Sequence, residues 1–154
     1  MREFDMVVIH CSATPNGRRN TLEDLDKWHR AKGWQRKSAA MRAFNPRLTS
    51  IGYHYVIQVD GTIRTGRSEN EIGAHAAGYN TRSIGVCLIG TDKFTAAQWE
   101  SLADLIRRIK EGRKVLVLGH RDLKGVKKSC PGFDVSEWLA NGMTPPEHSL
   151  LPHG

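Results

Sequence analysis

Three side chains in this 154-residue sequence, His10, His120 and Cys130, are of the types that bind zinc in proteins. His10 lies in the apolar run 6–11 and His120 follows the apolar run 115–118, so both are predicted where a short buried strand meets a loop. Cys130 precedes a Pro-Gly pair in a polar loop. Three protein ligands rather than four leave one coordination position open for a water. These residues therefore predict a catalytic zinc site and an enzyme.

The other two cysteines are predicted to be core residues. Cys11 points to the opposite face of its strand from His10, and Cys87 lies within an apolar run. Cys130 instead follows three lysines, whose charges are expected to favour its thiolate form. The alternative interpretation is an ordinary loop cysteine and two core histidines.

Length and composition predict a single domain. The chain is 39% hydrophobic and has four tryptophans, which suits one sizeable core. Its three cysteines do not make a disulfide framework and fit a reducing compartment. The first five residues carry charges where a signal peptide needs an apolar stretch, and no apolar run is long enough to cross a bilayer. We therefore expect a cytoplasmic protein without membrane insertion, whose export needs a separate factor.

The charge balance limits the candidate partners. There are 23 basic and 16 acidic residues, and the net charge of +7 attracts polyanions such as nucleic acid or an anionic cell wall. The basic residues occur in small groups, without an aromatic-interleaved strand or a recognisable DNA-reading motif. No stable nucleic-acid complex is therefore expected.

The expected order of elements is strand, helix, insertion, hairpin, strand, helix, strand, long loop and short helix, which is typical of an α/β fold. Thr21 begins a helix as a capping box, with Trp28 expected on its buried face and an end near Gly33. Thr95 caps a second helix, and residues 135–139 suggest a last short one.

A β-hairpin is predicted from residues 53–59 and 62–65, which flank an Asp-Gly turn. The domain is expected to span residues 1–143. Residues 144–154 are expected to form a loose C-terminal tail.

Several ordered blocks of this sequence resemble one known family. They are VIHCSAT at 8–14, WH at 28–29, GW at 33–34, GYHY at 52–55, DGT at 60–62, GAHAAGYN at 73–80, SIGVCL at 83–88 and CPGFD at 130–134. In this order they are similar to the type 2 N-acetylmuramoyl-L-alanine amidases, which include small phage lysozymes and resemble peptidoglycan recognition proteins. The resemblance implies a phage or prophage endolysin that uses zinc to hydrolyse the amide between the lactyl group of N-acetylmuramic acid and L-alanine in bacterial peptidoglycan. It also implies a single-domain mixed β-sheet flanked by α-helices.

Carried over by position, the family's metal ligands fall on His10, His120 and Cys130, the residues already reached from their types and spacing. Its catalytic tyrosine falls on Tyr53 and its catalytic lysine on Lys128. A phenol and an ammonium near the metal would donate to the oxyanion of a tetrahedral intermediate.

The resemblance also places the GAHAAGYN block beside the cleft. His75 and Asn80 are therefore expected to contact the glycopeptide substrate. The alternative is a turn that merely needs its glycines.

Two other classes remain open, namely a non-catalytic peptidoglycan-binding module and a regulator that binds a polymerase or nucleic acid. A binding module does not need a complete zinc triad, so the presence of Cys130 together with Tyr53 and Lys128 favours the enzyme. We expect a monomer that is held in the host bacterial cytoplasm before its release to the cell wall.

The stretch 35–50 departs from the family pattern as an insertion. It is expected to form an extra wall of the cleft. Its cations Arg36, Lys37, Arg42 and Arg47 are expected to dock the enzyme on anionic wall polymer. The alternative is a solvated loop.

Overall fold

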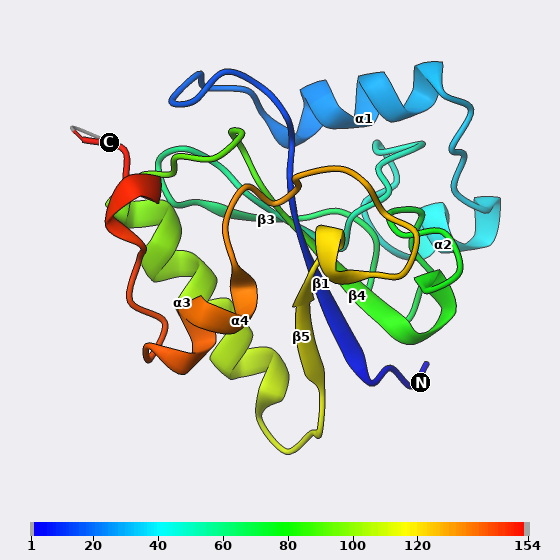
Figure 1. Ribbon diagram of the computed structural model, residues 1–154. Coiled ribbons are helices and arrows are strands. Elements are labelled where there is room, and N and C mark those ends of the chain that lie inside the picture. Colours follow the sequence, from blue (N-terminus) through cyan, green and yellow to red (C-terminus); the bar gives the residue numbers. More distant parts are fainter. Residues whose placement is uncertain (1, 153–154) are drawn as a thin grey trace.

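The structure, a computed structural model, describes residues 2–152 (Figure 1). Among these residues, five strands form one sheet in the order β3-β2-β4-β1-β5. Neighbouring strands are parallel except for the antiparallel pair β2–β3, so the sheet is mixed. The strands are β1 (Met6–Cys11), β2 (Tyr55–Ile57), β3 (Ile63–Thr65), β4 (Ser83–Leu88) and β5 (Leu116–Gly119). The predicted α/β class, with its mixed sheet and its hairpin, is confirmed.

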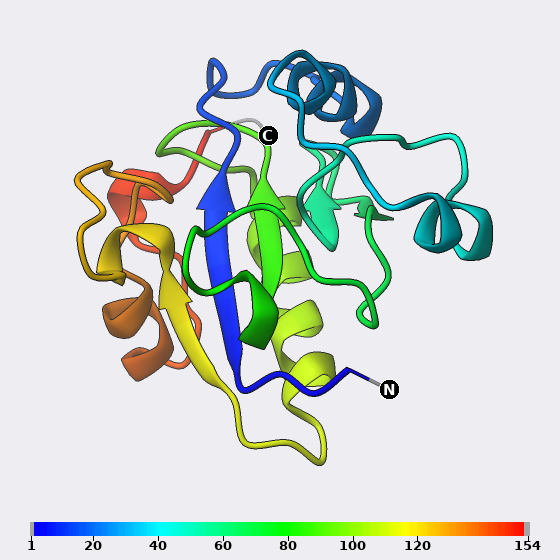
Figure 2. The ribbon, with the colours of Figure 1, turned by 90° about the vertical axis from the view of Figure 1, so that its right-hand side faces the viewer.

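Helices pack on one face of the sheet and near the carboxyl ends of its strands, whereas a long loop crosses the other face (Figure 2). α3 (Ala96–Lys110) and α4 (Val135–Ala140) pack on one face, and α1 (Leu22–Ala31) contributes to a core on the other. The remaining helices are α2 (Ser38–Ala43) in the insertion and the short 3-10 helices η1 (Asn80–Arg82), η2 (His120–Asp122) and η3 (Glu147–Ser149). No helix in the described part of the chain combines the length and the apolar character needed to cross a bilayer.

Side chains of the central strands alternate between the two faces of the sheet. Ile9 and Cys11 belong to the core on the α3 side, whereas Val8 belongs to a cluster on the opposite side. Cys87 is fully buried in the core that α1 covers. The prediction that Cys11 and Cys87 are core residues is therefore confirmed. His10 shares the face of Val8, so it points away from α3.

The predicted capping box at Thr21 forms, and the predicted cap at Thr95 forms a second capping box. The Thr21 hydroxyl accepts from the Asp24 amide at 3.2 Å, and the Thr95 hydroxyl accepts from the Gln98 amide at 3.0 Å. In each box the third residue accepts in return from the backbone N–H of the cap. Because these contacts satisfy amides that a helix end leaves free, they explain why α1 and α3 begin where predicted.

Trp28 is not the core residue that the apolar pattern of its helix predicted. Its side chain is 40% exposed. The buried side of α1 carries Leu22, Leu25, Asp26 and His29. Trp28 immediately precedes His29 and therefore lies about 100° around the helix from it. This places Trp28 on the flank of α1 rather than under it.

The segment 147–151 is docked on the domain, so the expected loose tail is wrong for these residues. The Ser149 carbonyl accepts from the Phe94 N–H at 2.9 Å and from the Trp99 indole N–H at 3.1 Å. The Leu151 N–H donates to the Phe94 carbonyl at 2.8 Å. Residues 153–154 of the expected tail lie outside the described residues.

The insertion 35–50 is organised around one buried arginine. The Arg36 guanidinium donates to both carboxylate oxygens of Glu71, at 3.0 and 2.8 Å, and to backbone carbonyls within the insertion. Its side chain is 0% exposed. The prediction that Arg36 docks on wall polymer is therefore wrong, because this guanidinium is inaccessible and its donors are already used.

The other three cations of the insertion, Lys37, Arg42 and Arg47, are exposed. Their role in wall binding stays a prediction. Residues 35–50 line neither of the hollows that contain the candidate metal ligands. The expectation that the insertion forms an extra wall of a longer cleft stays a prediction.

Candidate metal centre and active site

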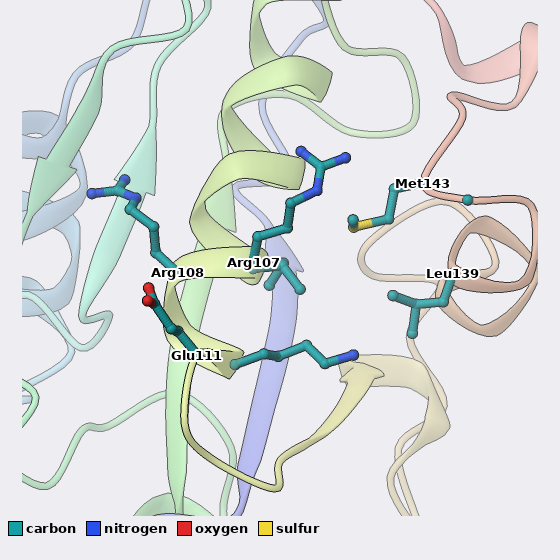
Figure 3. A pocket seen from close by; sticks show the side chains of 8 residues that line it. Arg107, Arg108, Glu111, Leu139 and Met143 are labelled. Carbon is teal, nitrogen blue, oxygen red and sulfur yellow. The ribbon is translucent and has the colours of Figure 1, made fainter.

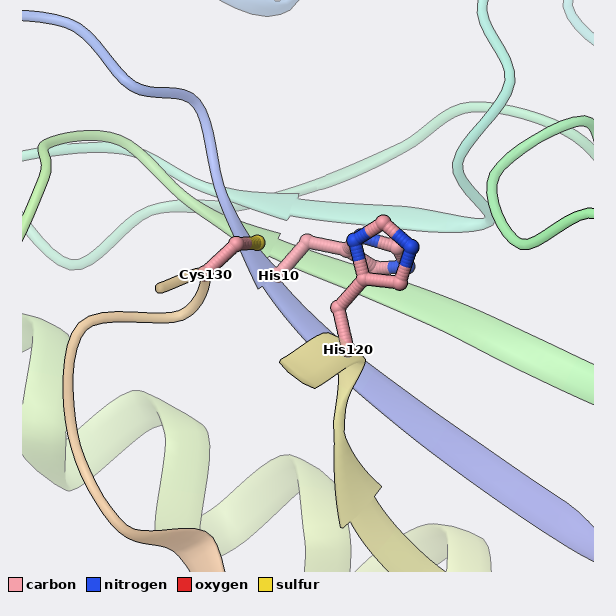
Figure 4. Close-up of side chains that lie close together, drawn as sticks. All are labelled: His10, His120 and Cys130. Carbon is pink, nitrogen blue, oxygen red and sulfur yellow. The ribbon is translucent and has the colours of Figure 1, made fainter. Parts of the chain in front are cut away.

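The candidate metal centre lies at the carboxyl end of the central strands. β1 pairs in parallel with β5, and the register that aligns Ile9 with Gly119 places His10 beside His120. The centroids of these two imidazole rings are 4.5 Å apart. Two histidines 110 positions apart in the sequence are thus neighbours because each ends a strand of one parallel pair (Figure 4).

Cys130 reaches the same place from the loop between η2 and α4. The backbone N–H of Cys11 donates to the Cys130 Sγ at 3.1 Å, and the Arg121 N–H donates to the Cys130 carbonyl at 2.8 Å. Ligand atoms of His10, His120 and Cys130 all lie within 4.8 Å of one another. Two imidazoles and one thiol at this spacing fit the donor set of a catalytic zinc site.

Electrostatics at the two histidines favours the form that binds a metal. Burial lowers the pKa of His10 well below its ordinary value, and repulsion from His75 and His120 lowers that pKa further. Burial, with the nearby Lys128 charge, lowers the pKa of His120. Both rings are therefore neutral near pH 7, and a neutral imidazole is the form that coordinates a metal.

The protonation of the third candidate ligand, Cys130, depends on Cys11 and on burial. A hydrogen bond with Cys11 and burial raise the pKa of the Cys130 thiol, so the metal-free chain holds it protonated. None of the three preceding lysines is among the main causes of this shift, so their expected effect on the thiolate stays a prediction. Zinc binding would therefore release a proton from Cys130.

A hollow of about 200 Å³ opens over the three candidate ligands. Tyr53 and Lys128, the two residues that the family resemblance marks as catalytic, line it together with those ligands. The Tyr53 ring lies 5.1 Å from that of His10, centroid to centroid, and burial raises the pKa of Tyr53 well above its ordinary value. The structure thus places a protonated phenol and an exposed ammonium beside the candidate metal site.

An adjoining hollow of about 550 Å³ shares Trp34, His75, His120 and Lys128 with the first, and Asn80 also lines it. The polar atoms of His75 and Asn80 nevertheless make bonds within the protein. Asn80 Oδ1 accepts from the backbone N–H groups of His75 and Ala76, both at 2.9 Å. The substrate contacts expected of His75 and Asn80 stay predictions, because both side chains also have structural partners.

The sequence did not predict an aromatic rim around the hollow that opens over the candidate ligands. Trp28 and Trp34, 40% and 37% exposed, line the hollow with Lys32, whose ammonium lies 4.7 Å from the centroid of the Trp34 ring. His29 lies beneath this rim, where its Nδ1 accepts from the Gly52 N–H at 2.8 Å. The spacing of apolar residues in α1 gave no signal for the rim, since it marks Trp28 as core.

A further hollow, of about 540 Å³, lies between α3 and α4, away from the metal ligands (Figure 3). Its lining combines the apolar Ile106, Leu139 and Met143 with Arg107 and other charged residues of α3. It contains no histidine or cysteine among the described residues. The candidate metal ligands, Tyr53 and Lys128 line the hollow at the end of β1 instead.

Solved structures with this architecture are amidases and peptidoglycan recognition proteins. The amidase LysC of Clostridium intestinale URNW aligns with a TM-score of 0.73 at 29% identity, covering 93% of this chain and 87% of LysC. Drosophila PGRP-LB aligns with a TM-score of 0.68 at 26% identity, covering 94% and 85%. The fold therefore defines the type 2 amidase and peptidoglycan recognition protein superfamily.

Sequence comparison gives the family within that class. The family described as N-acetylmuramoyl-L-alanine amidase matches residues 1–133. The endolysin of Escherichia phage T7 is 36% identical over 143 residues, covering 87% of this chain and 84% of that endolysin. The endolysin of Enterobacteria phage T3 has the same identity and coverage. The chain belongs to the N-acetylmuramoyl-L-alanine amidase family and is an enzyme.

Proposed function

We propose that this chain is a zinc-dependent endolysin of a phage or prophage, which hydrolyses the amide between the lactyl group of N-acetylmuramic acid and L-alanine in peptidoglycan. The observation that carries the zinc requirement is the convergence of His10, His120 and Cys130 on one hollow. Relatives named endolysins support the biological role. A structural neighbour, a point mutant of Drosophila PGRP-LB, was solved in complex with tracheal cytotoxin, which supports a peptidoglycan fragment as ligand.

The residues around the hollow suggest how the chain treats its substrate. When bound, zinc supplies a Lewis acid for the scissile carbonyl and an acidic water for the attack. Tyr53 keeps its proton and offers an O–H donor where negative charge develops on the carbonyl oxygen. Lys128 offers a second, charged donor at the same hollow. Both residues line the hollow that contains the three candidate ligands, and we infer that a carbonyl bound there would meet both donors.

The complete donor set favours an enzyme over a non-catalytic binding module. Cys130 approaches His10 and His120 although the thiol must give up its proton for zinc to bind. A binding module gains nothing from such a site. We infer that the substrate is bacterial peptidoglycan, that the chain acts as a monomer, and that it forms no stable nucleic-acid complex.

Purified protein tests the proposal directly on sacculi. We expect about one zinc per chain and the release of new alanine amino termini without new reducing sugar ends. Chelation is expected to abolish hydrolysis and to lower the thermal midpoint, since a ligand that binds only the folded state stabilises it. Full activity in zinc-free protein would contradict the cofactor, and new reducing ends would contradict the amide as the cleaved bond.

Removing either proposed oxyanion donor is expected to slow turnover. Tyr53→Phe and Lys128→Ala should each lower kcat on sacculi roughly a hundredfold, as loss of one oxyanion donor does, while zinc stays bound. Lys124→Ala is the matched control, because Lys124 is exposed in the same loop and lines neither hollow. A variant of Tyr53 or Lys128 that keeps wild-type turnover removes that residue from the mechanism.

A further inference from the structure

His75 lies against His10, one of the candidate metal ligands, and contributes to the lining of both hollows at this site. His10 Nε2 and His75 Nδ1 are 2.9 Å apart, and His75 Nε2 and Ser83 Oγ are 3.2 Å apart. The exposed fractions are 2% for His10, 9% for His75 and 0% for Ser83. Three side chains from β1, the 73–80 turn and β4 therefore form one buried hydrogen-bonded chain that ends on a metal ligand.

The surrounding backbone is shaped to hold the His75 ring in this place. A Cβ at Gly85 would lie 2.6 Å from His75 Cγ, and a Cβ at Gly73 would lie 2.7 Å from His75 Cδ2. Any larger residue at either glycine would displace the ring. Asn80 fixes the backbone N–H of His75 from the other side. The ring therefore has a fitted cavity, and its contact with His10 follows from that cavity.

The direction of the hydrogen bonds decides whether His10 can bind a metal. A neutral imidazole carries its proton on one nitrogen and a lone pair on the other. If His10 Nε2–H donates to His75 Nδ1, the Nδ1 of His10 keeps a lone pair for a metal. If His75 Nδ1–H donates to His10 Nε2 instead, the proton of His10 is on Nδ1, and neither of its nitrogens is free. Only the first direction leaves His10 with a nitrogen that can coordinate a metal.

The Ser83 hydroxyl can donate or accept, so its contact with His75 is compatible with the first direction. In the first direction, His75 carries its proton on Nε2 and donates it to the Ser83 oxygen. The Nδ1 of His10 has no hydrogen-bond partner among the residues the structure describes, as a coordinating atom requires. Metal-binding histidines usually donate their other N–H to a neighbouring acceptor, which fixes both the tautomer and the ring orientation.

We propose that His75 and Ser83 are positioning residues that hold His10 as its Nε2–H tautomer and so present Nδ1 to the metal. This inference rests on the proposed zinc site and assigns His75 a role other than substrate contact. Loss of such a partner typically weakens metal binding by about 10- to 100-fold. The effect therefore falls on zinc affinity, whereas loss of a substrate contact would fall on KM.

Two substitutions at His75 separate hydrogen bonding from packing. His75→Phe keeps a ring in the cavity but removes the acceptor for His10. His75→Asn loses most of the ring but keeps an acceptor, Oδ1, at the place of Nδ1. We expect the zinc dissociation constant, measured by competition with a chromophoric chelator, to rise about 10- to 100-fold in His75→Phe and markedly less in His75→Asn. His148→Phe, at an exposed histidine, is the control.

The opposite result would be a zinc dissociation constant close to wild type in His75→Phe and a raised one in His75→Asn. That result would show that His75 only fills space and would overturn the proposal. A second measurement uses the unmodified protein, in case the variants do not fold. Nitrogen-15 NMR of metal-free wild type should show His10 protonated at Nε2 and unprotonated at Nδ1, and the opposite pattern would overturn the proposal.

The outcomes also distinguish this inference from the proposed function. If wild type binds zinc and His75→Phe binds it equally well, the positioning role is wrong and the zinc enzyme stands. If wild type binds no zinc, both the cofactor and the positioning role are wrong.

Discussion

Replacing Cys130 with serine is expected to abolish hydrolysis of sacculi and to remove zinc, while the protein still folds and still sediments with peptidoglycan. A neutral hydroxyl is a much poorer zinc ligand than a thiolate. The expected loss of zinc affinity exceeds the roughly 10- to 100-fold that follows loss of a supporting residue. Folding should survive, because the strands that carry His10 and His120 pair with each other independently of Cys130. Zinc content and released alanine amino termini are the measurements.

The two other cysteines provide matched controls. In Cys11→Ser the backbone N–H that donates to the Cys130 Sγ is unchanged. Cys11→Ser and Cys87→Ser should therefore keep zinc and activity, and lose about 1–3 kcal/mol of stability from burying a hydroxyl. If Cys130→Ser kept hydrolysis while Cys11→Ser lost zinc, the assignment of the third ligand would be wrong.

Arg36→Ala is expected to cost about 3–5 kcal/mol in the free energy of unfolding, the usual result of removing one partner of a buried ion pair. The substitution leaves the Glu71 carboxylate with Arg67, 3.7 Å away, as its remaining cation, and it strips several backbone carbonyls of their donor. Urea unfolding measures the loss.

Arg42→Ala is the control for this prediction, since Arg42 is an exposed cation of the same insertion. Its stability should change by no more than about 0.5 kcal/mol. If Arg36→Ala instead kept wild-type stability and bound sacculi more weakly at low salt, the structural role given to Arg36 would be wrong. The earlier prediction that Arg36 binds wall polymer would then be correct.

Much of the fold follows from signals that are local in the sequence. The caps at Thr21 and Thr95 are satisfied within one turn of helix, so their residue types suffice to locate α1 and α3. Trp28 shows the limit of such signals. The apolar pattern of a helix marks a stripe, but how far the neighbouring chain covers the edge of that stripe depends on tertiary packing.

The candidate site was also predictable only in part, because some of its contacts depend on tertiary packing. His10 and His120 are recognisable because each ends an apolar run, and a parallel sheet gathers strand ends at one edge. The bond between His10 and His75 joins positions 65 apart, and that between Arg36 and Glu71 joins positions 35 apart. No spacing rule relates such pairs, so a surface role for Arg36 looked as reasonable as a buried one.

The three candidate ligands come from parts of the chain that differ in local stability. His10 lies on β1, which is hydrogen-bonded on both sides by β4 and β5, whereas Cys130 lies in a loop. Loops open at a lower free-energy cost than central strands. A bound ion would therefore escape through brief opening of that loop, with the sheet intact. Its residence time would be set by loop dynamics, so substitutions that strengthen the sheet would raise heat resistance without prolonging metal retention.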